Sequence, residues 1–163
     1  MRVVEGRLGG EGFRVSLVAA RFNETIVERL VEGARRALRQ LGVAEADIEL
    51  VWVPGSLEIP ALVAELLERG GQDAIVALGA VIRGETPHFE YVSAGVSQGI
   101  AELSRRRRFP IGFGVLTVDT VAQAEARAGG KLGNKGFEAA QTALETASVL
   151  RQLRQAGSGP ERP

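Results

Sequence analysis

Residues 74–92 have the sequence AIVALGAVIRGETPHFEYV, which is more informative about the fold than any other part of the chain. Its first half, 74–82, is a short apolar run rich in valine, isoleucine and alanine, typical of a strand buried on both faces of a sheet. A polar turn with Gly84 follows, and Pro87 is favoured at the first position of a helix. The stretch therefore predicts a strand, a tight turn and a helix that begins at Pro87.

Similar apolar runs recur along the chain, at 13–20, 48–53 and 111–118. Helical patterns separate them: apolar residues fall on one face of 26–41, and 60–69, 92–107 and 136–155 can form further helices. Thr120 and Gln123 make a capping box before another helix. Strands that alternate with helices predict an α/β domain with a parallel sheet covered on both faces.

Neither a linker nor a repeat divides the chain, so we expect one domain over residues 1–156 and a flexible tail over 157–163. The first twelve residues can form an additional strand. Four glycines among them make such a strand weak alone, so we expect it to need a neighbour.

Composition excludes several classes of site. The chain has no cysteine and one histidine, which rules out thiolate chemistry and makes a histidine metal site unexpected. Twenty basic residues balance twenty acidic ones, so no overall basic field attracts nucleic acid, and the cluster 105–108 is interpreted as a solvated helix end. With neither a signal-peptide pattern nor a membrane-spanning run, we expect a cytoplasmic protein without membrane contact.

Polar segments follow each predicted strand, at 21–23, 54–60, 83–88 and 117–120. The carboxyl edge of an open parallel sheet is where ligands bind, so we expect these segments to converge on one crevice.

The only histidine, His88, lies in the first turn of the predicted helix. Backbone amides near Gly84, Glu85 and Thr86 would point outward at the positive end of the helix dipole, where an anion fits. His88 would then be placed to exchange a proton with a phosphate-bearing substrate. The alternative is that Thr86 and Pro87 only start the helix and His88 fills surface space.

Other candidates also have structural alternatives. Phe22 can stack on a flat heterocycle or belong to the core, and Ser56 and Glu58 can bind a polar ring or merely shape a turn. Arg127 can clamp a phosphate or simply end a helix before two glycines. Residues 131–136 form a glycine-rich loop, but they lack the spacing of a Walker motif.

Five segments together carry a family resemblance: RFN at 21–23, VPGSLEIP at 53–60, GAVIRGETPHFEYV at 79–92, FGVLTVDT at 113–120 and RAGGKLGNKGFEAA at 127–140. They closely resemble 6,7-dimethyl-8-ribityllumazine synthases, and the match runs from about Val4 to Leu153. The resemblance implies a flavodoxin-like three-layer sandwich with a four-stranded parallel sheet.

The resemblance also implies the reaction. In this family, 5-amino-6-(D-ribitylamino)uracil condenses with 3,4-dihydroxy-2-butanone 4-phosphate, and phosphate and water leave. The product is 6,7-dimethyl-8-ribityllumazine, in the penultimate step of riboflavin synthesis. No metal or organic cofactor is implied.

Roles carried over from the family fall into two groups. The pyrimidine side would use Phe22, Ser56, Leu57, Glu58, Ala80, Val81, Ile82 and, from an adjacent subunit, Phe113. The butanone phosphate side would use Glu85, Thr86 and Arg127, with His88 as the proton-transfer residue and Lys135 as a further basic residue near the shared site. Two positions depart from the pattern: Leu57 stands where an aromatic is frequent, and Glu90 where aspartate is common.

The resemblance further implies a homo-oligomer of pentamers, and the compact 129–136 turn resembles that of members that form a 60-subunit icosahedral shell. The N-terminal segment would add a strand to a neighbouring subunit. Enclosure of riboflavin synthase is left open. Two rival classes are a flavin- or lumazine-binding module, which would not need His88, Arg127 and the phosphate turn together, and a purely structural cage.

Overall fold

The structure is a computed structural model that describes residues 1–157. Four parallel strands form one sheet in the order β2 (Ile48–Val53), β1 (Val15–Ala20), β3 (Ala74–Ile82) and β4 (Ile111–Val118). Three of the predicted ranges coincide with these strands, and the first strand begins two residues later than expected. The predicted tail lies outside the described residues except for Gly157, which ends the last helix.

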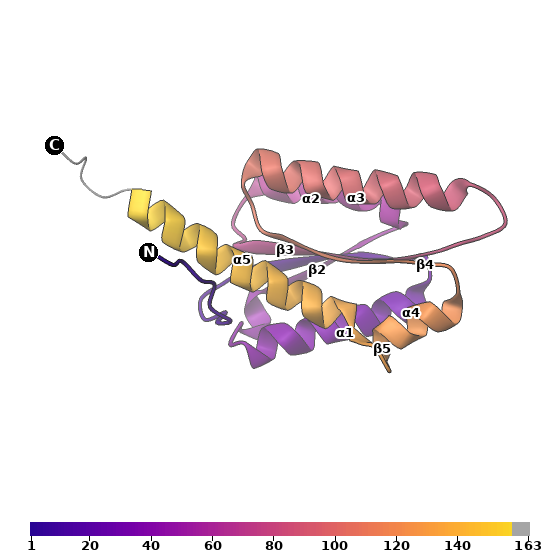
Figure 1. Ribbon diagram of the computed structural model, residues 1–163, viewed down its shortest axis with the longest axis horizontal. Coiled ribbons are helices and arrows are strands. Elements are labelled where there is room, and N and C mark those ends of the chain that lie inside the picture. The colour runs from indigo at the N-terminus through magenta and orange to yellow at the C-terminus, as the bar shows by residue number, and fades with distance from the viewer. Residues whose placement is uncertain (158–163) are drawn as a thin grey trace.

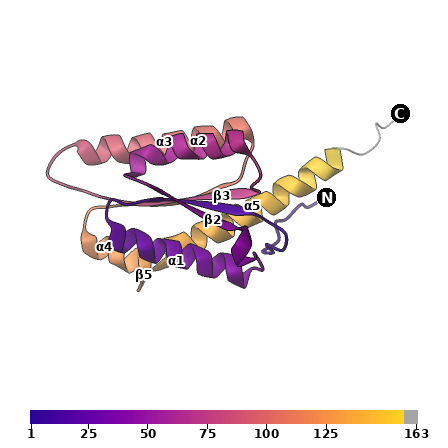
Figure 2. The same cartoon turned by 180° about the vertical axis from the view of Figure 1, so that it is seen from behind.

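Helices cover both faces of the sheet (Figures 1 and 2). One face carries α2 (Ile59–Arg69) and α3 (His88–Arg107), and the other carries α1 (Glu24–Gln40), α4 (Val121–Arg127) and α5 (Lys135–Gly157). Each face has its own apolar core cluster. The strand order is that of flavodoxin-like folds, so the predicted α/β three-layer sandwich is confirmed.

Short elements complete the chain. The 3-10 turns η1 (Glu45–Asp47) and η2 (Ser56–Glu58) flank β2, and an antiparallel hairpin of β5 (Ala128–Gly130) and β6 (Gly133–Asn134) precedes α5. The hairpin includes part of the glycine-rich segment 131–136.

The strand termini position the crevice. Pairing of β1 with β3 stops at Ala19 and Leu78, whereas β3 continues beside β4 to the pair Ile82 and Val118. The last residues of β3 therefore extend past the end of β1. This leaves room beside them for the loop that follows β1.

Helix termini agree in part with the sequence prediction. The Thr120 hydroxyl accepts the N–H of Gln123 (3.2 Å), and the Gln123 side chain accepts the N–H of Asp119 (2.8 Å), so the predicted cap is present. The helix predicted at Pro87 begins one residue later, at His88, and no side chain caps it. The Thr86 hydroxyl does not cap this helix, because Pro87 itself occupies the cap position.

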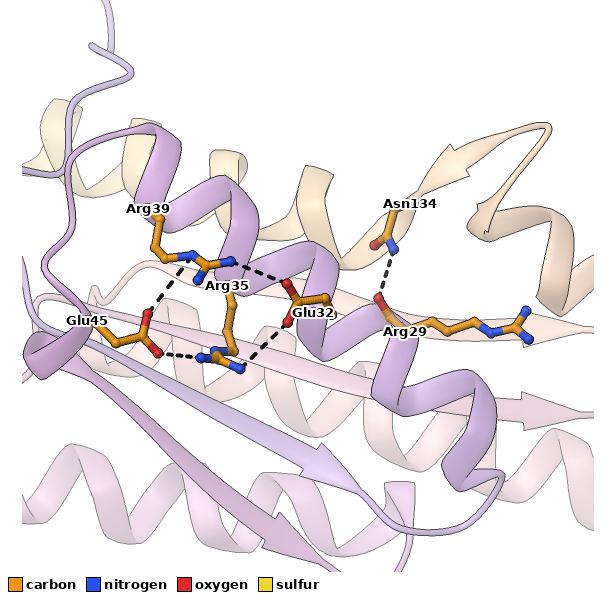
Figure 3. A network of polar contacts seen from close by, with 6 residues as sticks. All are labelled: Arg29, Glu32, Arg35, Arg39, Glu45 and Asn134. Atoms are coloured by element: carbon orange, nitrogen blue, oxygen red, sulfur yellow. Dashed lines mark hydrogen bonds and ion pairs between the residues drawn. The ribbon is translucent and has the colours of Figure 1, made fainter.

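Asn134 caps the start of α5, because its side-chain oxygen accepts the N–H groups of Gly136 (2.9 Å) and Phe137 (3.1 Å). The Asn134 amide also donates to the carbonyl of Arg29 on α1 (2.9 Å), as Figure 3 shows. A Cβ atom at Gly136 would lie 2.0 Å from the Leu30 carbonyl oxygen, so only glycine permits this close approach of α1 and α5.

An ion-pair network on the outer side of α1 joins Glu32, Arg35, Arg39 and Glu45 (Figure 3). The hydrogen bond and charge of Glu45 raise the pKa of Arg35. Because these groups are exposed, each pair adds little stability, and the network mainly ties η1 to α1.

The N-terminal segment forms neither helix nor strand in residues 1–14. It lies against its own chain instead: Gly10 donates to Leu41 O (2.6 Å), Arg7 N–H to Ser148 (3.1 Å), and Gln152 to Glu5 O (2.8 Å). Strand addition to a neighbouring subunit stays a prediction.

Candidate active site

A cavity of about 580 Å³ opens at the carboxyl edge of the sheet, a size typical of small-molecule sites. Three of the four predicted segments line it, together with the first turns of α3. Its walls are formed by Phe22, Asn23, 54–58, 80–82, Gly84, Thr86, His88, Phe89 and Val92. The fourth segment, 117–120, does not line the cavity, although its Asp119 contacts Arg83 beside it.

The β1–α1 turn is fixed by hydrogen bonds to the segment after β2 and to β3. Phe22 N–H donates to Pro54 O (3.1 Å), and Asn23 adopts a left-handed conformation with φ of 61°. From there the Asn23 side chain donates to the carbonyl of Ala80 on β3 (2.8 Å). These contacts hold Phe22 at the rim of the cavity with 72% of its surface exposed, so a ligand can cover its ring.

The segment after β2 brings polar groups to the cavity wall. Ser56 is buried at 6% exposure, packed so closely on β3 that a Cβ atom at Gly79 would lie 2.5 Å from its hydroxyl oxygen. Glu58 lies two residues further on and is exposed. Within residues 1–157, neither the Ser56 hydroxyl nor the Glu58 carboxylate has a hydrogen-bond partner, so both are available to a ligand.

The turn after β3 forms the opposite side. Residues 83–88 are all exposed, and Thr86 and His88 line the cavity. In the described part of the chain, the side chains of 84–88 make no hydrogen bond or ion pair. The amide groups at the start of the 20-residue α3 are suited to an anion, with the His88 imidazole beside them.

Four predicted site residues do not line this cavity. Glu85 is exposed in the turn, and Phe113 lies on the edge strand β4 with 41% of its surface exposed. Arg127 donates to a backbone carbonyl of its own helix (3.1 Å), and Lys135 forms an ion pair with Glu138 (2.6 Å). The single chain therefore contains only part of the predicted constellation.

Sequence reasoning did not single out Asn23, Phe89 or Val92, which also line the cavity. Asn23 had a signal, because asparagine after a strand tolerates the left-handed conformation. Phe89 and Val92 read as ordinary apolar helix residues, and nothing local marks them as cavity walls.

The described residues contain no cluster of three or more histidine, aspartate or glutamate side chains that could hold a metal ion. Over the same part of the chain, no helix is both long and apolar enough to cross a bilayer. Chemically, the cavity offers an exposed aromatic ring, unpaired polar groups, a helix N-terminus and one imidazole. This combination can hold a flat polar ring beside an anion.

Comparison with known proteins gives two findings. The model of the family described as 6,7-dimethyl-8-ribityllumazine synthase matches residues 12–151. Among solved structures, a de novo designed Rossmann fold protein is similar, at 18% sequence identity and a TM-score of 0.41, over 69% of this chain and 90% of that chain.

Proposed function

Because the chain belongs to the 6,7-dimethyl-8-ribityllumazine synthase family, we propose that the cavity at the carboxyl edge of its sheet is where that family's two substrates meet. The protein is a transferase of riboflavin biosynthesis. It condenses 5-amino-6-(D-ribitylamino)uracil with 3,4-dihydroxy-2-butanone 4-phosphate to form 6,7-dimethyl-8-ribityllumazine, phosphate and water. Residues 1–156 are taken as one synthase domain.

The pyrimidine binds on the side formed by the first two loops. The Phe22 ring stacks on the uracil, and the free Ser56 hydroxyl and Glu58 carboxylate hydrogen-bond its polar edge and the ribityl chain. Leu57 supplies apolar contact, and the backbone of 80–82 closes the cavity wall. The observation that carries this assignment is the convergence of unpaired polar groups and an exposed aromatic ring in one cavity.

The butanone phosphate binds on the side formed by the third loop. Its phosphate accepts hydrogen bonds at the turn of Glu85 and Thr86, beside the N-terminus of α3. The pyrimidine amine attacks the ketone to give an imine with loss of one water, phosphate leaves, and the ribitylamino nitrogen closes the ring on the remaining carbonyl with loss of a second water. His88 lies between the two sides and transfers protons in these steps.

Alignment of the two substrates supplies most of the rate enhancement. Holding reactants in an aligned pair lowers the barrier by about 7–11 kcal/mol at best, whereas a positioned acid or base contributes about 10²- to 10⁴-fold. His88 therefore assists a reaction that the cavity has already made favourable.

Phe113, Arg127 and Lys135 complete the site from an adjacent copy. None of the three lines the cavity of its own chain, and the family assembles into oligomers. We place Arg127 of the neighbour on the phosphate, Phe113 beside the pyrimidine ring and Lys135 near both. The assembly is a pentamer, and twelve pentamers form a 60-subunit icosahedral shell.

Two further points rest on the sequence alone. The N-terminal segment leaves its own chain and adds a strand to a neighbour on assembly. The protein acts in the cytoplasm, where riboflavin synthase is a candidate for the shell interior because it consumes the product.

The first experiment mixes purified protein with both substrates and follows lumazine and phosphate against a protein-free control. Equal acceleration of both products supports the proposal. His88→Ala should slow turnover while pyrimidine affinity, measured by calorimetry, stays within about twofold of the parent. A well-folded oligomer that binds the pyrimidine without accelerating either product would favour a binding module instead.

A complementation experiment tests the shared site. His88→Ala and Arg127→Ala chains are each weakly active alone, because each damages every site. Oligomers co-assembled from both should recover activity, since by random mixing roughly a quarter of the sites pair an intact His88 with an intact Arg127. Mixed oligomers no more active than the average of the two parents would place both residues on one chain.

A further inference from the structure

The end of β3 carries an arginine that the assigned roles do not use. Arg83 follows β3 directly, and its backbone N–H donates to Val118 O at the end of β4 (2.9 Å). It does not line the cavity. The next five residues contain the proposed phosphate turn and His88.

The Arg83 side chain contacts two other segments at once. Its Nε donates to Asp119 after β4 (2.8 Å), and its Nη1 donates to Glu90 in the first turn of α3. The guanidinium also lies over the Phe89 ring, 4.2 Å from the ring centre. Arg83 therefore connects the sheet, the β4–α4 loop and the beginning of α3.

The contacts of Arg83 lie on both sides of the turn 84–88, which makes few contacts through its own side chains. The side chains of 84–88 make no hydrogen bond or ion pair in the described chain, and α3 begins without a side-chain cap. Arg83 holds the residue before the turn, and it holds Phe89 and Glu90 just after His88. Its contacts are polar links at both ends of the turn.

Arg83 also balances charge beside the proposed phosphate position. Its hydrogen bond lowers the pKa of Glu90, so Glu90 is ionised at neutral pH. One cation thus faces two carboxylates. Without it, two unbalanced carboxylates would stand next to a turn that has to bind an anion.

We propose that Arg83 is a positioning residue that holds the phosphate turn and His88 in their catalytic geometry and screens Glu90 and Asp119 from the phosphate. The inference rests on the proposed function of that turn. Arg83 touches neither substrate, and it acts through the residues on either side of it.

The test compares Arg83→Met with Arg107→Met in steady-state kinetics. Arg107 is a matched control, because it lies at the far end of α3, is 40% exposed against 43% for Arg83, and also pairs with a glutamate, Glu68. Arg83→Met should lower kcat by about 10- to 100-fold and raise KM for the butanone phosphate, since displacing reacting groups by about 1 Å costs on the order of 100-fold. Its pyrimidine Kd should stay within about twofold of the parent. Arg107→Met should leave all three constants within about twofold.

Two rescue variants separate positioning from charge. Arg83→Lys keeps the cation but cannot span both carboxylates with a planar fork, so it should restore KM more than kcat. The triple variant Arg83→Met, Glu90→Gln, Asp119→Asn removes the excess negative charge and should restore KM while kcat stays low. If Arg83→Met fails to fold, Asp119→Asn removes one arm and should lower kcat by itself.

The outcomes distinguish this inference from the proposed function. If His88→Ala is slow but Arg83→Met behaves like Arg107→Met, the positioning role is wrong and the active site stands. If pyrimidine affinity and thermal stability fall together in Arg83→Met, Arg83 is only structural. If neither the parent nor any variant accelerates the reaction, the proposed function itself fails.

Discussion

Replacing Phe22 by alanine tests the pyrimidine side of the cavity most directly. The ring is 72% exposed in the free chain, and burying a whole aromatic side chain covers roughly 200 Å². A ligand stacked on one face would cover about half of the exposed part, roughly 70 Å². At about 25 cal/mol per Å² this is worth about 1.8 kcal/mol, or about a 20-fold change in Kd.

The assay is calorimetric titration of the pyrimidine substrate alone, so that no turnover intervenes. Phe22→Ala should weaken Kd by about 20-fold, and Phe22→Leu by less, because leucine keeps apolar area without a flat face. Thermal stability should change by less than about 0.5 kcal/mol in either variant, since the side chain is exposed.

Tyr91→Ala is the matched control. Tyr91 is an aromatic residue of similar exposure, 76%, and it does not line the cavity. The Kd of Tyr91→Ala for the pyrimidine should equal that of the parent. Size-exclusion chromatography should first show that all variants form the same oligomer. An unchanged Kd in Phe22→Ala, or an equal loss in Tyr91→Ala, would refute stacking on Phe22.

Three further predictions follow from the packing and the charges. Gly79→Ala should displace the Ser56 hydroxyl and weaken pyrimidine binding by about 5- to 10-fold, the value of one hydrogen bond, and adding Ser56→Ala should cost nothing more in calorimetry. Gly136→Ala should force α1 and α5 apart and lower stability by about 1–3 kcal/mol in denaturant titration. Glu49→Gln should lower stability by about 0.2–1 kcal/mol at pH 7, and this difference should vanish as the pH falls through the lowered pKa of Glu49 in the folded protein.

The direction of this pH effect on stability follows from the ion pair between Arg69 and Glu49. The hydrogen bonds of Arg69 to Glu49 (2.9 and 2.5 Å) lower the pKa of that carboxyl, against a smaller opposing effect of burial. The ionised Glu49 carboxylate therefore contributes its full stabilisation above the pKa that Glu49 has in the unfolded chain. This stabilisation is lost as the pH falls through the lower pKa that Glu49 has in the folded protein. A stability difference that grows on acidification would contradict this.

Gly9→Ala controls for the glycine substitutions, because a Cβ atom there meets nothing within 4 Å. Gly9→Ala should change neither the pyrimidine Kd in calorimetry nor the stability in denaturant titration. A loss of stability in Gly9→Ala as large as that in Gly136→Ala would show that the effect is not one of packing.

Local pattern was sufficient to predict the sheet. The runs 48–53, 74–82 and 111–118 are apolar and bounded by turn residues, and each forms a strand over that range. The first strand begins two residues late, where the N–H of Arg14 donates to the side chain of Asp73 (2.8 Å) and not to a neighbouring strand. That contact joins residues far apart in sequence and leaves no local pattern.

The site was predicted less completely, for the same reason. Strand ends identified the crevice, but the conformation of Asn23 depends on the Ala80 carbonyl, 57 residues away. Arg83 likewise donates a hydrogen bond to Asp119, which lies 36 residues away in the sequence. Roles for Phe113 and Arg127 came from family resemblance, and the fold of one chain keeps both outside its cavity.

The unpaired side chains of the cavity have an evolutionary consequence. The side chains of Glu58, Thr86 and His88 are exposed and make no hydrogen bond within the described chain, so the fold does not rest on them. Substitutions there alter chemistry without threatening the stability threshold that purges most mutations. A duplicated copy of such a gene could lose or change its reaction while still producing a folded subunit, which gives selection a durable scaffold on which to try new ligands.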